Sequence, residues 1–312
     1  MSDSITISCP ICECPENAYL GPYRSKHGMF DGTSKVSCIN CGLVFANPMP
    51  EEKEITRYNS SYFNVAHGGL TNDPHKISFF TGIAKIRANY ISNYLIKNKL
   101  KVKKILEIGP GQGFFASNWI NNNPDVEYSV VETDNSCFSY LEKLGIKIMP
   151  SLDPVRSVKK DLIVMSHVLE HVSNPKAFLS SASKWLSLKG VLFIEVPCRD
   201  YMHKKIDEPH LLFFDKHSLV KLLENAGYKN IQITYHGKSL SSLKLESYFT
   251  KKLLTLRQQL ISLGLLFPFC RFQNGLEFLN PLEISVLKPF EAHVQSEVPS
   301  WWIRAIAMKV DT

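Results

Sequence analysis

The chain has 312 residues, which is enough for one large α/β domain and a smaller module. It carries 36 Lys and Arg against 29 Asp and Glu, a net charge of +7, and its basic residues are scattered, which argues against a nucleic-acid partner. No stretch reaches the about 18 apolar residues of a membrane-spanning helix, and the N-terminus lacks the basic and apolar regions of a signal peptide, so we expect a cytoplasmic protein.

Two C-x-x-C pairs near the N-terminus predict a metal site with four thiolate ligands: Cys9, Cys12, Cys38 and Cys41. In a reducing compartment such cysteines bind metal more readily than they form disulfides. Four thiolates fill a tetrahedral zinc site and leave no position for water or substrate, which favours a structural over a catalytic zinc. We therefore expect a zinc ribbon over residues 1–48, with Cys14 as an alternative ligand.

Residues 49–100 are expected to link the ribbon to the main domain. From residue 74 to residue 97, apolar side chains recur at helical spacing. This pattern predicts a helix that packs on the main domain.

The stretch KKILEIGPGQGFFASNW, residues 103–119, predicts a buried parallel strand, a turn and a helix. The turn carries Gly109, Gly111 and Gly113, which allow a sharp reversal and let a ligand approach the backbone. A dinucleotide motif would need its third glycine where this chain has Phe114, and no Lys followed by Ser or Thr closes the turn as in an ATP-binding loop. Neither nucleotide fits.

The pattern E-x-G-x-G-x-G, from Glu107 to Gly113, resembles the first motif of the class I S-adenosylmethionine-dependent methyltransferases. The resemblance implies that the turn holds S-adenosylmethionine, with Glu107 as an acceptor near the ligand's ammonium. Glu132 ends the next apolar run, 19 positions after Gly113, where an acidic side chain can accept hydrogen bonds from both ribose hydroxyls.

Further donor contacts are expected after the next two strands. Asp153 is a candidate acceptor for the adenine amino group, and a plain turn aspartate is the alternative. Ser166 and His167 follow the fourth strand, at residues 162–165, whose carboxyl end opens onto the ligand crevice in such sheets. In related methyltransferases the upstream helix and loop fold over the donor, which adds three candidate contacts: Tyr62, Phe63 and Arg87.

The expected fold is therefore α/β, a seven-stranded Rossmann-like methyltransferase sheet with a small N-terminal zinc ribbon. The resemblance implies that the last strand runs antiparallel between the fifth and sixth. The core spans residues 101–236, an insertion spans 237–298, and residues 299–312 supply the closing strand.

Three further stretches narrow the resemblance: the two cysteine pairs followed by GLVFANPMP, the sequence HVLEH, and PHLLFF. Together they are similar to bacterial methyltransferases with an N-terminal zinc-binding region, which include enzymes of surface-polysaccharide and antibiotic sugars. Sugar C-methyltransferases of this kind carry Tyr-His-Glu-His after the fifth strand, whereas this chain has Asp207-Glu208-Pro209-His210. The missing tyrosine favours O-methylation of a sugar, nucleotide-linked or in a surface glycan such as O-antigen. The alternatives are C-methylation of a nucleotide-linked keto-sugar and methylation of another small molecule.

A hydroxyl acceptor needs a base, and His210 is the first candidate because imidazole titrates in the useful range. A histidine that only shapes its loop is the alternative, and His171 is the second candidate base. His167, Glu170 and His171 have the spacing of one helix face, so two interpretations stay open: a divalent metal site, or a face that caps the helix and lines the donor pocket.

The insertion is longer than a strand connection requires, and residues 253–269 are strongly apolar. We expect a lid or a subunit interface there, or a peripheral membrane contact if the acceptor is carried on a lipid. A non-enzyme alternative is an inactive donor-binding scaffold with a zinc docking module. The intact Glu107, glycine turn and Glu132 argue against that alternative.

Overall fold

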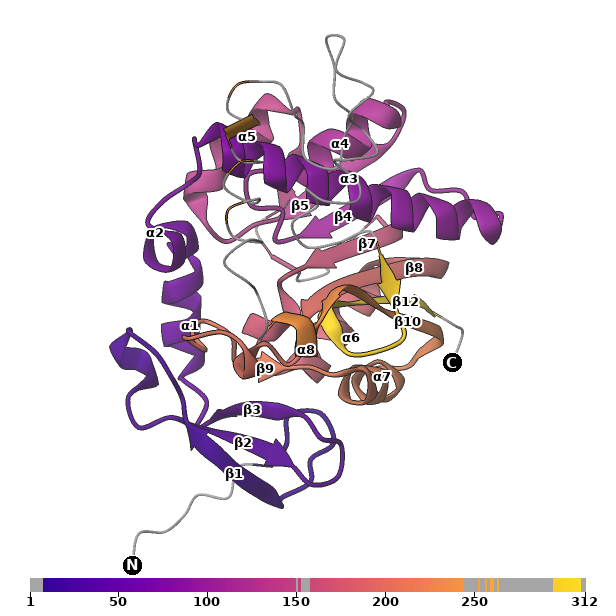
Figure 1. The fold of residues 1–312 in the computed structure, drawn as a ribbon. Helices are drawn as coiled ribbons and strands as arrows, with labels where there is room; N and C mark the ends of the chain where they lie inside the picture. The colour runs from indigo at the N-terminus through magenta and orange to yellow at the C-terminus, as the bar shows by residue number, and fades with distance from the viewer. Residues whose placement is uncertain are drawn as a thin grey trace, which may run out of the picture.

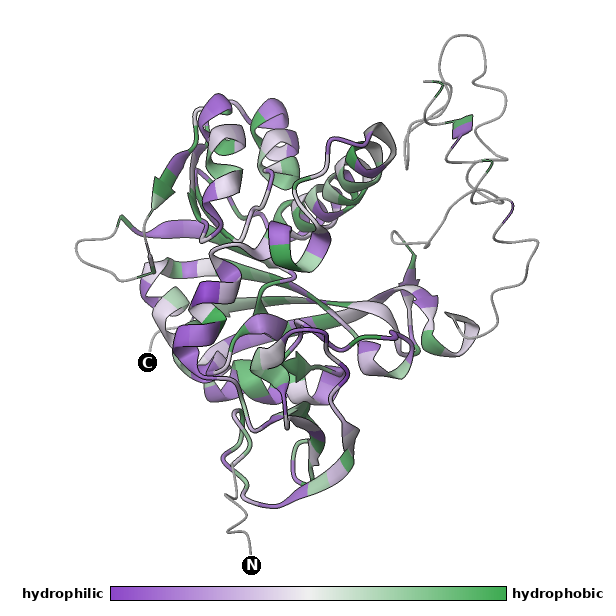
Figure 2. Cartoon of the chain, turned by 90° about the vertical axis from the view of Figure 1, so that its left-hand side faces the viewer, coloured by the Kyte–Doolittle hydropathy of each residue, from purple (hydrophilic) through white to green (hydrophobic). Residues whose placement is uncertain are grey.

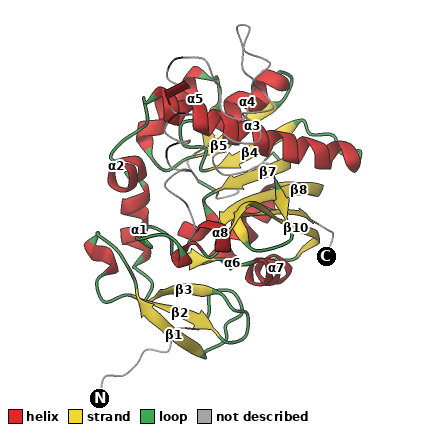
Figure 3. Cartoon of the chain, in the orientation of Figure 1, coloured by secondary structure: helices red, strands yellow, loops and turns green. Residues whose placement is uncertain are grey.

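The computed structural model of the protein describes residues 8–149, 151–152, 158–243 and 294–309, together with residues 252, 256, 259, 260 and 263. In this part of the chain the strands form two sheets (Figures 1 and 3). The larger contains, in spatial order, β11 (Gln295–Ser296), β10 (Tyr228–Ser239), β12 (Ser300–Lys309), β8 (Leu186–Pro197), β7 (Lys160–Ser166), β4 (Lys104–Ile108), β5 (Glu127–Val131) and β6 (Lys147–Met149). The smaller contains β1 (Asn17–Pro22), β2 (Ser34–Cys38), β3 (Val44–Asn47) and β9 (Leu212–Phe213).

The strand order of the larger sheet confirms the predicted methyltransferase topology. Strands β6, β5, β4, β7 and β8 are parallel neighbours. The last long strand, β12, runs antiparallel between β8 and β10, as expected. The two-residue strand β11 adds an edge beyond the seven predicted strands.

Helices cover both faces of this sheet (Figure 1). On one face lie α3 (Pro74–Lys97), α4 (Phe114–Asn122) and α5 (Phe138–Lys143). On the other lie α6 (Pro175–Trp185) and α7 (Lys216–Asn225). The connections contain α1 (Glu52–Asn59), α2 (Tyr62–His67), α8 (Leu240–Leu243) and the short 3-10 turns Gly28–Phe30, Asn135–Cys137, Leu169–His171 and Asp200–Met202.

Successive side chains along each strand point to opposite faces of the sheet and pack against the helices on either side. In β4, Ile105 packs with the α3 and α4 side, whereas the next residue, Leu106, packs with the α6 and α7 side. Figure 2 shows these apolar strands enclosed between helices whose outer faces are polar. The predicted helix over residues 74–97 is present as α3 and contributes Ile91, which is fully buried.

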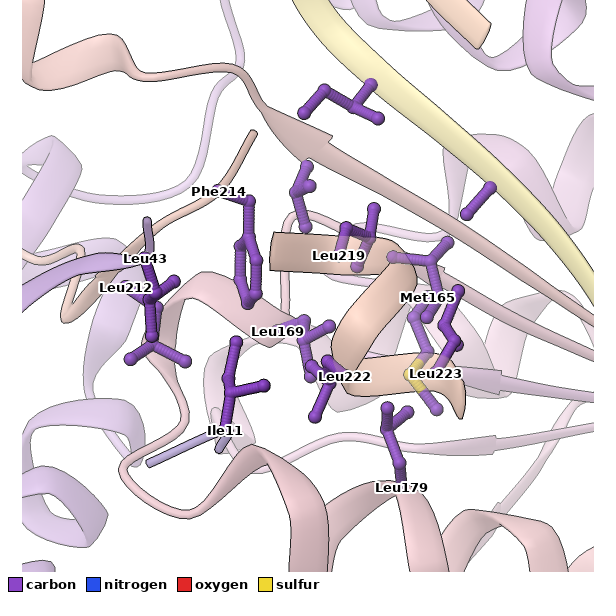
Figure 4. Packing of buried hydrophobic residues seen from close by; sticks show 14 of the residues in the cluster. Ile11, Leu43, Met165, Leu169, Leu179, Leu212, Phe214, Leu219, Leu222 and Leu223 are labelled. Atoms are coloured by element: carbon purple, nitrogen blue, oxygen red, sulfur yellow. The ribbon is translucent and has the colours of Figure 1, made fainter. Parts of the chain in front are cut away.

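The ribbon is joined to the main domain by a strand that was not predicted from the sequence. Strand β9 follows β8 in the chain but pairs with β3, with Val44 opposite Phe213 and Phe45 opposite Leu212. Apolar side chains continue across this junction, because Ile11 and Leu43 of the ribbon lie beside Leu212 and Phe214 (Figure 4). The ribbon therefore shares one hydrophobic core with the α6 and α7 face. Among the described residues, no helix is both long and apolar enough to cross a membrane.

Candidate active site

The glycine turn between β4 and α4 forms the floor of the site. Gly109 and Gly111 have φ values of +67° and +55°, in the left-handed region that favours glycine. A Cβ on Gly109 would lie 2.6 Å from Val168 Cγ2, and one on Gly111 would lie 2.9 Å from Phe63 Cζ. Gly113, also at positive φ, is the N-cap residue of helix α4. The turn is thus as tight as the motif predicts.

Glu132 lies beside this turn, at the end of β5. Its Oε2 accepts a hydrogen bond from the Gly111 amide at 2.8 Å, and its Oε1 accepts from the amides of Thr133 at 2.7 Å and Asp134 at 2.9 Å. Burial raises the pKa of Glu132 although these amides oppose the shift. The structure therefore brings Glu132 and the glycine turn together.

Glu107 lies beneath the turn and is almost fully buried. Its Oε2 accepts a hydrogen bond from the Tyr128 hydroxyl at 2.8 Å. Burial raises the pKa of Glu107 to about 7, against the hydrogen bond from Tyr128 and the charge of Arg87. The carboxyl group therefore titrates near neutral pH.

Ser166 and His167 stand at the carboxyl end of β7, as predicted. The Ser166 Oγ is buried and has no hydrogen-bond partner among the described residues. His167 has a φ of +57°, and its Nδ1 lies 3.2 Å from Glu170 Oε1 while its Nε2 lies 3.4 Å from Glu195 Oε1. A positive φ in a residue other than glycine carries strain, which is found most often at functional sites. Asp153 lies outside the described residues.

A buried ion network around Glu195 was missed by sequence reasoning. Glu195, on β8, is 0% exposed and pairs with Arg304 Nε of β12 at 2.6 Å and with Arg87 Nη2 of α3 at 2.5 Å. Burial alone would raise the pKa of Glu195, but Arg87 and Arg304 hold it well below its usual range. Arg87, a predicted donor contact, is therefore engaged with Glu195. The available signal was a charged residue inside each of two apolar strands.

The two candidate bases lie next to each other. The rings of His171 and His210 meet edge to face with centroids 4.9 Å apart. His210 Nδ1 lies 2.8 Å from Asp200 Oδ2, and Asp200 also pairs with Lys204 Nζ at 2.7 Å. Burial would raise the pKa of Asp200, but His210 and Lys204 lower it. Asp200 is therefore ionised beside His210, which the sequence did not suggest.

His171 is held in a neutral form. Its Nδ1 lies 3.3 Å from the Pro209 carbonyl, so the Nδ1–H donates there and Nε2 keeps its lone pair. Burial lowers the pKa of His171 to about 4. The Nε2 atom has no hydrogen-bond partner among the described residues.

Helix α2 connects the turn to the histidine pair. The Phe63 ring lies over Gly111, and the Phe63 amide donates to Asp134 Oδ2 at 2.8 Å. The neighbouring Tyr62 ring meets the His171 ring with centroids 5.4 Å apart. Both aromatic residues named as candidate contacts are thus at the site.

Two groups of side chains have the geometry to hold a metal ion. One ligand atom from each of the four predicted cysteines lies within 4.8 Å of the others, and the Sγ atoms of Cys9 and Cys41 are 3.5 Å apart. Sulfur atoms around a tetrahedral zinc are separated by about 3.8 Å, since the Zn–S distance is about 2.3 Å. The hydrogen bond between the two thiols lowers the pKa of Cys9 to about 5 and raises the pKa of Cys41, so Cys9 is the thiolate of this pair. The cysteines therefore fit a zinc ion, and Cys14 is outside the group.

The second group differs from the predicted one. Glu170, His171 and His210 each place one ligand atom within 4.8 Å of the others. His167 instead lies before the 3-10 turn that replaces the expected helix, and it faces Glu195. Two imidazoles and one carboxylate match the protein ligands of several catalytic metal sites.

Comparison with known proteins decides the family of the central domain. Residues 84–233 match a family of methyltransferase domains. These residues form a methyltransferase domain. The prediction of a methyltransferase enzyme is thereby confirmed, and S-adenosylmethionine is the donor that the E-x-G-x-G-x-G motif predicts for it.

Individual relatives of the methyltransferase are distant. An uncharacterized protein of Methanocaldococcus jannaschii is 26% identical over 152 residues, which are 45% of this chain and 71% of that protein. A SAM-dependent methyltransferase of Archaeoglobus fulgidus is 18% identical over 80% of this chain and 98% of its own, with a TM-score of 0.47. A possible histamine N-methyltransferase of Thermotoga maritima is 16% identical over 75% of this chain and 91% of its own, with a TM-score of 0.45. These relatives leave the acceptor open.

Proposed function

We propose that the protein transfers a methyl group from S-adenosylmethionine to a hydroxyl group of a sugar, nucleotide-linked or in a surface glycan. The observation that supports this proposal is that helix α2 contacts both parts of the site. One is the glycine turn beside Glu132, and the other is the group of His171, His210 and Asp200. Phe63 covers Gly111, whereas Tyr62 contacts His171, which in turn contacts His210. A donor held at the turn would thus have a base close to its methyl group.

The donor end is proposed to use the groups around the turn. Glu132 would exchange its backbone partners for the ribose hydroxyls, and the close turn would let the ligand pack on the backbone. Glu107, beneath the turn, would accept from the ammonium. The Ser166 hydroxyl, which has no hydrogen-bond partner in the part of the chain that the structure describes, and the adjacent His167 complete this end of the site.

The acceptor end is proposed to work by in-line displacement with His210 as general base. The acceptor oxygen attacks the methyl carbon, the carbon–sulfur bond breaks, and sulfur leaves with its electron pair as a neutral thioether. The acceptor's proton moves to His210 Nε2, while Asp200 at Nδ1 orients the ring and stabilises the imidazolium. A carboxylate behind an imidazole has the same role in hydrolase triads.

A structural zinc ion in the ribbon is part of the proposal. Cys9, Cys12, Cys38 and Cys41 would bind it with no open coordination position, so the metal would stabilise the fold and take no part in methyl transfer. The predicted lid or interface at residues 253–269 lies almost wholly outside the described residues.

The test combines donor binding with methyl transfer. We expect S-adenosylhomocysteine to bind in calorimetry, and tritium-labelled methyl groups to pass from S-adenosylmethionine to surface polysaccharide extracted from a strain that lacks the gene. His210→Ala should keep donor binding and lose transfer, whereas His217→Ala, at an exposed position on α7, should keep both. Absence of S-adenosylhomocysteine binding would rule out the proposed methyl transfer.

The group of Glu170, His171 and His210 supports one alternative mechanism. A divalent cation bound there would occupy the His210 lone pair that a base requires. Cobalt added to protein that already holds one zinc tests this, because cobalt absorbs visible light when bound. A second bound metal that Glu170→Gln abolishes would make His210 a ligand instead of a base.

A further inference from the structure

We propose that the zinc ribbon positions the loop of His210, so that the ribbon is a working part of the acceptor site and not a separate docking module. The inference rests on the proposed role of His210 as base. It concerns residues 207–213, which follow the core strand β8 and end in the strand β9 that joins the ribbon sheet.

The ribbon contacts His210 directly. The Tyr23 hydroxyl donates a hydrogen bond to the His210 carbonyl at 2.8 Å, and Tyr23 is 7% exposed. The Tyr23 ring is stacked on Phe30, also in the ribbon, with centroids 4.6 Å apart. A packed ring thus holds the hydroxyl at the backbone of the proposed base.

The ribbon also holds the chain three residues before His210. The Asp207 carboxylate is fully buried and accepts from the Arg24 amide at 2.8 Å, from Arg24 Nε at 2.9 Å and from Lys35 Nζ at 2.5 Å. Lys35 is itself almost fully buried and also donates to the Pro22 carbonyl at 2.6 Å. The Arg24 side chain is partly exposed, whereas Lys35 and Asp207 form a buried pair. A buried, hydrogen-bonded ion pair has little freedom to shift, because any displacement leaves a charge without its partner.

Glu208 makes a third connection on this side. Its Oε2 accepts from the amides of Lys26 at 2.7 Å and His27 at 3.1 Å, and its Oε1 accepts from the Tyr58 hydroxyl at 3.0 Å. The resemblance to sugar C-methyltransferases aligns Asp207 and Glu208 with the first two residues of their Tyr-His-Glu-His segment. Here Asp207 and Glu208 face the ribbon and α1.

On the far side of His210, the ribbon sheet holds the chain again. The Ala46 amide donates to the Leu211 carbonyl at 2.9 Å, and β9 pairs with β3 over the next two residues. His210 therefore lies in a short segment fixed to the ribbon at both ends. The donor turn is held by other groups, namely Glu132 and Phe63. Loosening the ribbon should thus displace the base and leave donor binding intact.

The test compares two tyrosines of the ribbon. Tyr23→Phe removes the hydrogen bond to His210, whereas Tyr19→Phe alters a side chain that is 67% exposed. For Tyr23→Phe we expect faster amide hydrogen exchange in residues 207–213, methyl transfer reduced about tenfold, unchanged zinc content and S-adenosylhomocysteine affinity within about twofold of wild type. Tyr19→Phe should match wild type in all four measurements.

Asp207→Asn supplies a second variant with the same expected pattern, because it weakens the hold of Arg24 and Lys35 on the loop. If both variants keep wild-type exchange in residues 207–213, the inference is wrong. It is also wrong if donor affinity falls in parallel with transfer, since the ribbon would then support the whole domain. If His210→Ala retains methyl transfer, His210 is not the base. The hydrogen-exchange measurement would still show whether the ribbon restrains residues 207–213.

Discussion

At the scale of single residues, the glycine turn gives the most direct test of the donor site. Gly111→Ala would place a Cβ 2.9 Å from Phe63 Cζ at a φ of +55°. We expect S-adenosylhomocysteine to bind at least about tenfold more weakly, because Phe63 and the Glu132 contact must both shift, and the left-handed backbone adds about 1 kcal/mol of strain. Gly145→Ala is the matched control, with a φ of +68° and open space around its Cβ position. Equal calorimetric affinities for the two variants would contradict the prediction.

The buried Glu107 should also impose a pH dependence on stability. Its pKa is raised to about 7, so the folded protein binds a proton that the unfolded chain has released above about pH 4.5. The free energy of unfolding should therefore fall as the pH rises from about 4.5 to 7, by up to about 3 kcal/mol. Glu107→Gln keeps an acceptor for Tyr128 and should remove this slope.

Urea unfolding at a series of pH values measures this effect. Glu142→Gln, at an exposed position on α5, is the control and should retain the wild-type slope. A Glu107→Gln variant with that same slope would show that Glu107 does not titrate in this range.

At the scale of elements, the ion pair between Glu195 on β8 and Arg304 on β12 predicts that mutating one partner costs more unfolding free energy than its share of the double mutation. Glu195→Gln leaves Arg304, which is 1% exposed, without its carboxylate and should cost about 3–5 kcal/mol of unfolding free energy. Adding Arg304→Met removes the stranded charge, so the double variant should lose less than the sum of the single losses. Lys176→Met, which breaks the exposed pair with Glu13, should leave the free energy of unfolding nearly unchanged. Additive losses in urea unfolding would argue against a coupled network.

Some elements and contacts were predicted from the sequence, and others were not. The turn and the position of Glu132 were predictable because each follows an apolar run and a local motif, whereas the strand order followed from the resemblance to class I methyltransferases. The pairing of β9 with β3 and the contact between Lys35 and Asp207 were not predictable, because they join segments more than 160 residues apart and have no local pattern. His210 was proposed from the resemblance of its segment, whereas Asp200 beside it was missed because it lies in a short 3-10 turn with no spacing signal.

At the scale of the whole molecule, the shared hydrophobic core sets how the ribbon and the methyltransferase domain unfold. Ile11 lies between the cysteines of the first pair, is 0% exposed, and belongs to the same hydrophobic cluster as residues of the main domain such as Phe214 (Figure 4). Ile39 belongs to the second pair and is 60% exposed. If the zinc ribbon folded alone, its unfolding midpoint would not change when the main domain is destabilised. A ribbon that shares its core with the main domain unfolds together with it.

Ile11→Ala should therefore lower the unfolding free energy of the whole chain by about 2–5 kcal/mol, and Ile39→Ala should have little effect. The measurement follows two signals in one urea titration of the zinc-loaded protein. Tryptophan fluorescence reports on the main domain, where the buried Trp119 and Trp185 lie, and release of zinc to a chromophoric chelator reports on the ribbon. Both midpoints should move together in Ile11→Ala. An early zinc release with an unmoved fluorescence midpoint would mean that the ribbon is an independent unit, and a shared core would then be insufficient to couple it to the loop of His210.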